Sequence, residues 1–105
     1  MNFEKVKKRF IPMSETMLYI LLSLRQERHG YGIMQYVKEI THERITLGAG
    51  TIYQTLGKLE KDGLISPTRE EDRKKFYVMT ELGEQVLVEE ARRIKEIYEN
   101  VEGLL

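Results

Sequence analysis

The stretch from Leu47 to Thr80 decides the fold and reads LGAGTIYQTLGKLEKDGLISPTREEDRKKFYVMT. Within its first half, apolar residues recur at positions i, i+4 and i+7: Ile52, Leu56 and Leu59. Because this spacing places them on one face of a helix, the pattern predicts a helix over about 49–62. Gly48 and Gly50 permit a tight entry into that helix, and Gly63 ends it.

The second half of the stretch predicts a β-hairpin. Two short apolar runs, 64–65 and 76–79, have strand character, and the polar segment 70–72 between them is the expected turn. Pro67 has no N–H to donate, so its strand is expected at an edge of the sheet. The far strand carries three basic residues: Arg73, Lys74 and Lys75. A helix that can lie in a groove beside a charged hairpin is the layout of a winged helix-turn-helix, which favours duplex DNA binding as the function.

The residues before this stretch complete a helical body. Ser14 is a good N-cap for a buried helix over 14–28, and a second helix is expected over 31–42. Four residues of the second helix are expected on its inner face: Ile33, Tyr36, Val37 and Ile40. The alternating run 45–47 predicts a minor strand. The predicted fold class is therefore mainly α with a small β-hairpin.

Residues 81–105 predict one long helix that is capped by Thr80. Its apolar residues are spaced 4, 3, 4, 3 and 4 positions apart: Leu87, Ala91, Ile94, Tyr98, Val101 and Leu105. This heptad period forms a narrow seam that needs a partner helix. Burial in a homodimer is the favoured interpretation, and packing against the first or the N-terminal helix of the same chain is the alternative.

Residues 1–13 form an N-terminal arm or short amphipathic helix, separated from the body by Pro12. Two interpretations of its basic residues stay open, a solvated face or a phosphate contact: Lys5, Lys7, Lys8 and Arg9. The chain thus divides into this arm, a DNA-binding domain over 14–80 and a dimerisation helix over 81–105.

Length and composition indicate one folded domain, since 41% of the 105 residues are hydrophobic and 32% are charged. The chain has no Cys, no secretory signal pattern and no apolar run of about 18 residues, so we expect a cytoplasmic protein without a membrane partner. The formal net charge is zero, but residues 1–80 hold 14 Lys and Arg against 10 Asp and Glu. Because local fields steer a polyanion, this neutrality is weak evidence against DNA binding.

The helix over about 49–62 carries the residue types that read DNA. Five of its residues are expected on the outer face: Thr51, Gln54, Thr55, Lys58 and Lys61. Gln and Thr can exchange hydrogen bonds with base edges in the major groove, and Lys can reach guanine or a phosphate. Tyr53 has two open roles, completion of the core or contact of its hydroxyl with a phosphate. The basic residues 73–75 offer phosphate contacts, whereas the acidic tip at 70–72 argues against deep insertion into the minor groove.

Enzymatic and metal-binding classes find no support in the sequence. His29 and His42 lie in no nucleophile or HExxH context, and neither has a second metal ligand at helical spacing. The Gly48–Gly50 run lacks the further residues of a dinucleotide fingerprint or a P-loop. We therefore expect no catalytic residue, no metal and no cofactor.

Taken in order, the motifs of this chain resemble those of the PadR family of transcriptional regulators. They are HGYGI at 29–33, GTIY at 50–53 followed by Leu56 and Leu59-Glu60, DGLI at 62–65, Arg73, KFY at 75–77 and TELG at 80–83. Each motif alone is weak, but the ordered set covers nearly the whole chain from Ser14.

The resemblance implies a bacterial or archaeal homodimeric repressor with a winged helix-turn-helix, a C-terminal dimerisation helix and a pseudo-palindromic operator. It also implies release by a small aromatic or amphipathic effector bound near the dimer interface. At matching positions, it assigns five residues to the DNA-reading helix: Thr51, Tyr53, Gln54, Thr55 and Lys58. Lys74 and Lys75 belong to the wing, and Tyr31 and Tyr77 match motif tyrosines with structural or phosphate-directed roles. The short single C-terminal helix is similar to the smaller branch of the family.

The sequence therefore predicts a sequence-specific DNA-binding regulator that acts as a homodimer. The alternative is a winged-helix module that docks onto another protein without touching DNA, which the neutral net charge also suits.

Overall fold

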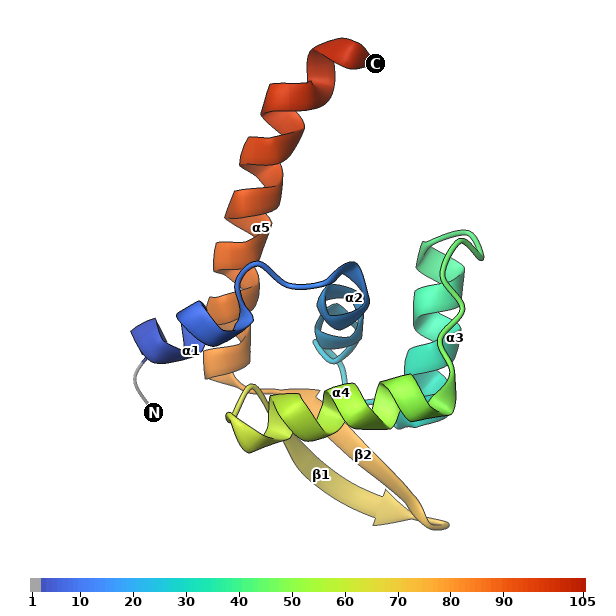
Figure 1. Cartoon of the computed structure of the whole chain (residues 1–105). Coiled ribbons are helices and arrows are strands. Elements are labelled where there is room, and N and C mark those ends of the chain that lie inside the picture. The colour runs from blue at the N-terminus through green and yellow to red at the C-terminus, as the bar shows by residue number, and fades with distance from the viewer. Residues whose placement is uncertain (1–2) are drawn as a thin grey trace.

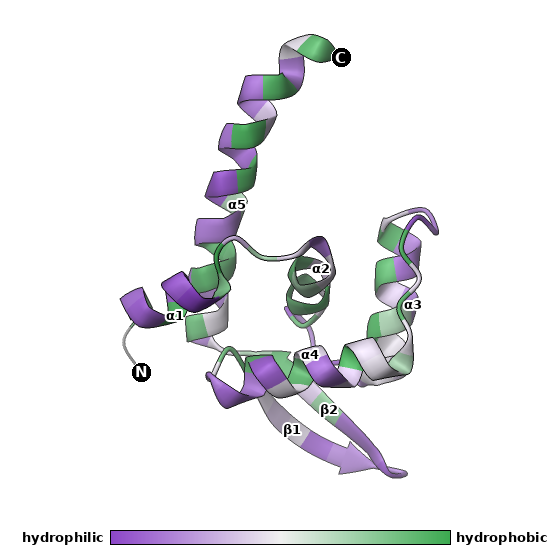
Figure 2. Ribbon diagram, viewed as in Figure 1, coloured by the Kyte–Doolittle hydropathy of each residue, from purple (hydrophilic) through white to green (hydrophobic). Residues whose placement is uncertain are grey.

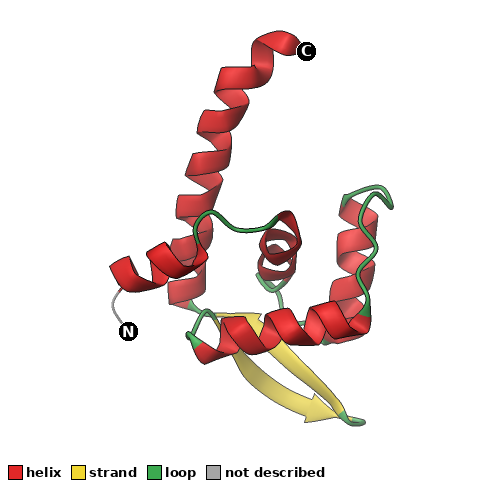
Figure 3. Ribbon diagram, viewed as in Figure 1, coloured by secondary structure: helices red, strands yellow, loops and turns green. Residues whose placement is uncertain are grey.

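The computed structural model describes residues 3–105, and Figure 1 and Figure 3 show a mainly helical chain with one two-stranded sheet. Its elements follow in the order α1 (Phe3–Phe10), α2 (Glu15–Ser23), α3 (Gly30–Ile40), α4 (Ala49–Lys61), β1 (Ile65–Glu71), β2 (Lys74–Met79), α5 (Glu81–Val101) and the 3₁₀ turn η1 (Glu102–Leu104). The body is built from α2, α3, α4 and the hairpin, and α5 rises away from it with α1 beside its base (Figure 1). The predicted fold class, a winged helix-turn-helix with a long C-terminal helix, is confirmed.

The core of the body surrounds α2, the most uniformly apolar helix in Figure 2. Three side chains of α2 and its C-cap are fully buried: Ile20, Leu21 and Leu24. The inner faces of α3 and α4 pack around them with Ile33, Val37, Ile52, Leu56 and Leu59, each at most 1% exposed. The helical spacing read from the sequence thus selects the core residues of α4 correctly.

The first predicted helix ends earlier than expected. Ser14 caps α2 as predicted, because its side chain accepts a hydrogen bond from the N–H of Met17 at 3.1 Å. The helix stops at Ser23, however, and residues 24–28 instead pair with the hairpin. The N–H of Met79 donates to the carbonyl of Leu24 at 2.7 Å, and Arg28 and Tyr77 exchange two backbone hydrogen bonds. The segment after α2 therefore anchors the hairpin to the body.

The second predicted helix and the minor strand also need correction. Ile40 was expected to face inward, but it is 38% exposed because α3 ends at this residue. Residues 45–47 form no strand, since the N–H of Ile45 binds the Thr41 hydroxyl at 3.2 Å and the segment has no ladder partner. The residue that pairs with the hairpin from outside it is Arg28, which bridges to Tyr77.

The hairpin, called the wing below, is longer than the sequence indicated. β1 and β2 are antiparallel, with a bulge between Pro67 and Arg69. The turn consists of Asp72 and Arg73, both in the left-handed region with φ of 52° and 65°, as a two-residue type I′ turn requires. The predicted turn over 70–72 is therefore correct only for Asp72, because residues 70 and 71 lie in β1, opposite Lys75 and Lys74.

Helix α5 begins as predicted at the cap residue Thr80, whose side chain accepts a hydrogen bond from the N–H of Gly83 at 3.1 Å. Its base is packed tightly, because a Cβ on Gly83 would lie 2.1 Å from the carbonyl oxygen of Leu64. Further along, the fully buried carboxylate of Glu90 accepts the N–H of Met13 at 2.5 Å and pairs with Arg93. These contacts fix the start of α5 and the linker after α1 to the body.

Helix α1 confirms the predicted short amphipathic helix. Val6 and Phe10 are buried, and α1 packs against α5. Within residues 3–105, no helix combines the length and the apolar character that crossing a membrane requires.

Candidate nucleic-acid interface

The outer face of α4 carries an exposed polar stripe. Thr51, Gln54, Lys58 and Lys61 are spaced 3, 4 and 3 residues apart, which places them along one side of the helix. All four are exposed, whereas the opposite side of α4 is buried in the core. No carboxylate belongs to this stripe, and α4 lies on the same side of the body as the wing (Figure 1). The stripe can therefore enter a groove without repelling phosphates.

Thr55 does not belong to this exposed stripe. It was expected to face outward, but it is only 9% exposed. Its position explains the error, because residue 55 lies three after Ile52 and four before Leu59 and so shares their side of the helix. A short Thr side chain fits there beside the core, and it is not available to a base edge.

Tyr53 and Tyr31 stand at the junction of α3 and α4 and are 58% and 59% exposed. A Cβ on Gly30 would lie 2.9 Å from the Tyr53 hydroxyl oxygen, so the start of α3 and the tip of this ring are in close contact. The Tyr31 hydroxyl accepts a hydrogen bond from the Gln35 side chain at 3.1 Å. Both rings are thus held by their neighbours and still present a surface to solvent.

The wing presents three exposed cations. Arg73 lies in the turn and Lys74 and Lys75 open β2, and none of the three forms an ion pair within residues 3–105. The carboxylates of residues 70 and 71 lie across the ladder from Lys75 and Lys74 without approaching them to ion-pair distance. These cations keep the freedom to bind an anion outside the molecule.

A cluster midway along the wing was missed by sequence reasoning. Arg69 donates to Glu27 at 2.9 Å, pairs with Glu71 and lies over the ring of Phe76, with its guanidinium carbon 3.8 Å from the ring centroid. Hydrogen bonds from the side chains of Thr68 and then of Arg69 hold the pKa of Glu27 below its ordinary value of 4.5. The cluster ties the wing to the segment after α2 and so sets the wing's orientation relative to α4.

The heptad seam of α5 is only partly covered within one chain. Leu87 is 8% exposed, but Ile94, Tyr98 and Val101 are 37%, 51% and 43% exposed, and Ala91 is exposed as well. Leu105 lies beyond the α-helix, after η1, and is 95% exposed. The seam is therefore a row of largely exposed apolar residues on the part of α5 that rises away from the body (Figure 2).

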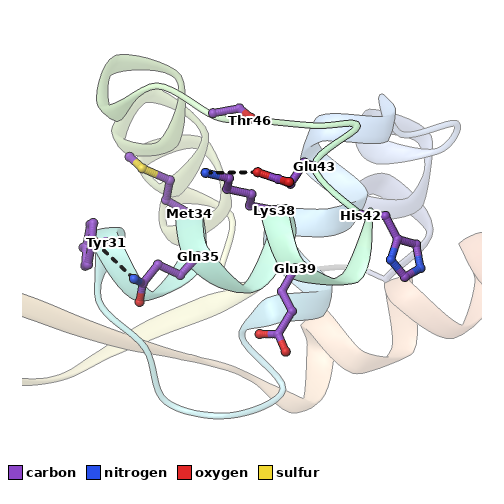
Figure 4. Close-up of a pocket in the computed structure, with 8 residues that line it drawn as sticks. All are labelled: Tyr31, Met34, Gln35, Lys38, Glu39, His42, Glu43 and Thr46. Carbon is purple, nitrogen blue, oxygen red and sulfur yellow. Dashed lines mark hydrogen bonds and ion pairs between the residues drawn. The ribbon is translucent and has the colours of Figure 1, made fainter.

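Two hollows flank these surfaces. One, of about 410 Å³, is mainly apolar and lies between α2 and the seam, with a lining that includes Leu18, Leu22, Leu87, Ala91 and Ile94. The other, of about 690 Å³, lies on the outer side of α3 and is lined by polar residues and Met34 (Figure 4). Its Lys38 is paired with Glu43 at 3.5 Å, and the described residues contain no cluster of potential metal ligands. Of the two, only the hollow beside the seam offers a small apolar molecule a suitable surface.

Comparison with known proteins places this arrangement in a family. Residues 17–89 match the model of the Transcriptional regulator PadR-like family. The chain is 34% identical over 98 residues to the transcriptional regulator YqjI of Escherichia coli, which covers 92% of this chain and 47% of the relative. The chain therefore spans about half the length of that relative.

Solved structures show the same fold. A structure of PadR from Bacillus subtilis in complex with operator DNA is 34% identical, with a TM-score of 0.62 over 74% of this chain and 47% of that one. A transcriptional regulator from Clostridium thermocellum, at 18% identity, superposes with a TM-score of 0.74 and covers 100% of this chain and 98% of its own.

Proposed function

This chain belongs to the PadR-like family of transcriptional regulators, and we propose that it is a sequence-specific DNA-binding repressor that acts as a homodimer and is released by a small-molecule effector. The family is one of regulators and not of enzymes. The observation that carries the proposal is the carboxylate-free outer stripe of α4 beside three unpaired cations of the wing. A DNA-binding repressor acts on the chromosome, so the proposal places the chain in the cytoplasm.

Each surface has a distinct role in this proposal. Thr51 and Gln54 read base edges in the major groove, since their side chains both donate and accept hydrogen bonds. Lys58 and the wing cations contact phosphates, which fixes the position of α4 without reading sequence. The exposed rings of Tyr31 and Tyr53 border the groove and contact the sugar-phosphate backbone. DNA binding by this chain is supported by the operator-bound structure of PadR from Bacillus subtilis, which is 34% identical to it.

The seam of α5 supplies the dimer. The seam residues Ile94, Tyr98 and Val101 expose apolar surface to water in a single chain. Packing against the same helix of a second copy buries this surface. A two-fold dimer presents two α4 helices, which fit successive major grooves about 34–36 Å apart, and the operator is then a pseudo-palindrome.

The effector site in this proposal is the apolar hollow between α2 and the seam. Its lining includes seam residues Leu87, Ala91 and Ile94, so a small aromatic or amphipathic molecule bound there lies against the partner helix. Such a molecule changes the angle between the two copies and hence the spacing of the two α4 helices. The dimer then leaves the operator, because the spacing of its two α4 helices no longer matches the fixed spacing of the two half-sites.

Affinity for a random duplex, measured across a range of salt concentrations, tests the proposal. We expect an apparent Kd of roughly 1 µM or tighter at low salt that weakens steeply as salt is added. Lys75→Ala should weaken binding to all duplexes alike and reduce the slope of log K against log salt by about 0.9. Absence of DNA binding at low salt contradicts the proposal and favours the alternative, a winged-helix module that docks onto another protein.

A further inference from the structure

A basic hollow lies between α1 and the C-terminal end of α4. It has a volume of about 380 Å³ and is lined by α1, the linker after it, α2 and α4. Its polar lining includes three cations and one carboxylate: Arg9, Lys58, Lys61 and Asp62. Figure 1 shows the C-terminal end of α4 running toward α1 at this place.

The charges in this basic hollow leave it positive. Asp62, the C-cap residue of α4, is buried with its side chain 8% exposed, and Arg9 pairs with it from α1. Arg9 is 52% exposed and has further N–H donors beyond those used in this pair. Lys58 and Lys61 form no ion pair within residues 3–105. The one carboxylate of the lining is thus neutralised, and two lysines remain to hold an anion.

The outer face of α1 extends this positive surface. Lys5 and Lys8 share a face of the helix with Arg9, at positions i, i+3 and i+4, while Val6 and Phe10 are buried on the other face. Both lysines are exposed and without an ion pair in the described part of the chain, whereas Lys7 pairs with Glu4 at 3.6 Å.

The length of α4 brings this region to the backbone of a bound duplex. Its 13 residues span about 20 Å, which exceeds the major-groove width of about 12 Å. Lys61 lies about 10 Å further along the helix axis than Gln54. When Gln54 faces the bases, the C-terminal end of α4 therefore reaches the phosphates at the edge of the groove.

We propose that the basic hollow and the adjoining face of α1 form a second phosphate site, which holds the DNA backbone flanking the groove occupied by α4. Arg9, Lys58 and Lys61 line the site, and Lys5 and Lys8 continue it along the backbone. This inference rests on the proposed function. It gives the N-terminal helix a role in DNA affinity in addition to its packing on α5.

Salt-dependent binding of random duplex DNA by Lys8→Ala and Lys61→Ala tests this site. Each variant should reduce the slope of log K against log salt by about 0.9, and the double variant by about twice that. The matched control is Lys95→Ala, an exposed lysine of α5 without an ion pair in residues 3–105, which should keep the slope of the unaltered chain.

Lys58 and Lys61 also lie in the last turn of α4, where cations stabilise a helix through its dipole. If Lys61 did only this, Lys61→Ala would lower the thermal midpoint and leave the salt slope unchanged. Unchanged slopes for both variants, with DNA binding intact in the unaltered chain, overturn this inference alone. Failure of the unaltered chain to bind DNA overturns the proposed function and this inference together. If the slope changes for Lys61→Ala but not for Lys8→Ala, the contribution of α1 to the site is overturned.

Asp62→Asn should change DNA affinity in the opposite direction to the lysine variants. It removes the buried negative charge and frees Arg9 for the phosphate, so it should tighten binding of random DNA and steepen the salt slope. Arg9→Gln leaves Asp62 unpaired and should weaken binding, and the double variant should return toward the unaltered affinity. Weaker binding by folded Asp62→Asn contradicts the site.

Discussion

At the scale of single residues, Gln54 carries the sequence-reading role. It is exposed in the middle of the α4 stripe, about one turn before Lys58 and two turns before Lys61, the lysines that are assigned to phosphates. Gln54→Ala should cost about 1–3 kcal/mol of binding free energy on the operator and leave the affinity for random duplex nearly unchanged. Fluorescence anisotropy with both duplexes measures this difference, with Gln85→Ala on exposed α5 surface as the control. Equal losses on both duplexes would exclude base reading by Gln54.

The exposed residues of α4 show how far local sequence determines a site. The positions of Thr51, Gln54 and Lys58 follow from subtracting the apolar stripe, and the structure places all three outside. The same subtraction also placed Thr55 outside, and this was wrong: Thr55 lies on the side of the helix that carries Ile52 and Leu59, so the core covers it.

Arg69 was missed for a different reason. Its partners Glu27 and Phe76 come from the segment after α2 and from the opposite strand, and the ladder is shifted by the bulge between Pro67 and Arg69. Register and bulges depend on pairing between distant residues, which the local pattern does not contain.

At the scale of elements, the base of α5 is fixed by the absence of a side chain at Gly83. Gly83→Ala would place a Cβ 2.1 Å from the Leu64 carbonyl oxygen and 2.8 Å from the Met79 side chain, so backbone must move. We expect a loss of about 1–3 kcal/mol or more in the free energy of unfolding, measured by urea denaturation. Gly57→Ala is the matched control, because its Cβ meets nothing within 4 Å and should stabilise α4 by about 0.5–1 kcal/mol. A Gly83→Ala variant as stable as the unaltered chain would contradict the close packing.

The sequence predicted well the elements that depend on local patterns. It predicted poorly the elements whose ends depend on hydrogen bonds between segments far apart in the chain. Helices α4 and α5 have strong periodicity and clear ends, and their bounds lie within a residue or two of the prediction up to Val101. The end of α2 depends on the hydrogen bonds of residues 24–28 with β2. The predicted strand at 45–47 is absent because this segment has no ladder partner, which the local pattern does not reveal.

At the scale of the whole molecule, the seam of α5 should determine the oligomeric state. Ile94→Lys places a charge in the middle of the proposed interface and should yield a monomer or an unfolded chain in sedimentation, since an unpaired charge is costly to bury. Glu96→Lys introduces the same side chain on the opposite face of the helix and should leave the dimer intact. If the Ile94→Lys variant forms a dimer with the dissociation constant of the unaltered chain, the seam is not the dimer interface.

In the proposed complex, two copies of α4, held apart by α5, bind two half-sites of duplex DNA. Selection of bound sequences from a random duplex library by the full chain tests it most directly. We predict enrichment of an inverted repeat whose half-site centres lie about 34–36 Å apart, one helical turn. Enrichment of a single unrepeated site, or no enrichment at all, would contradict it.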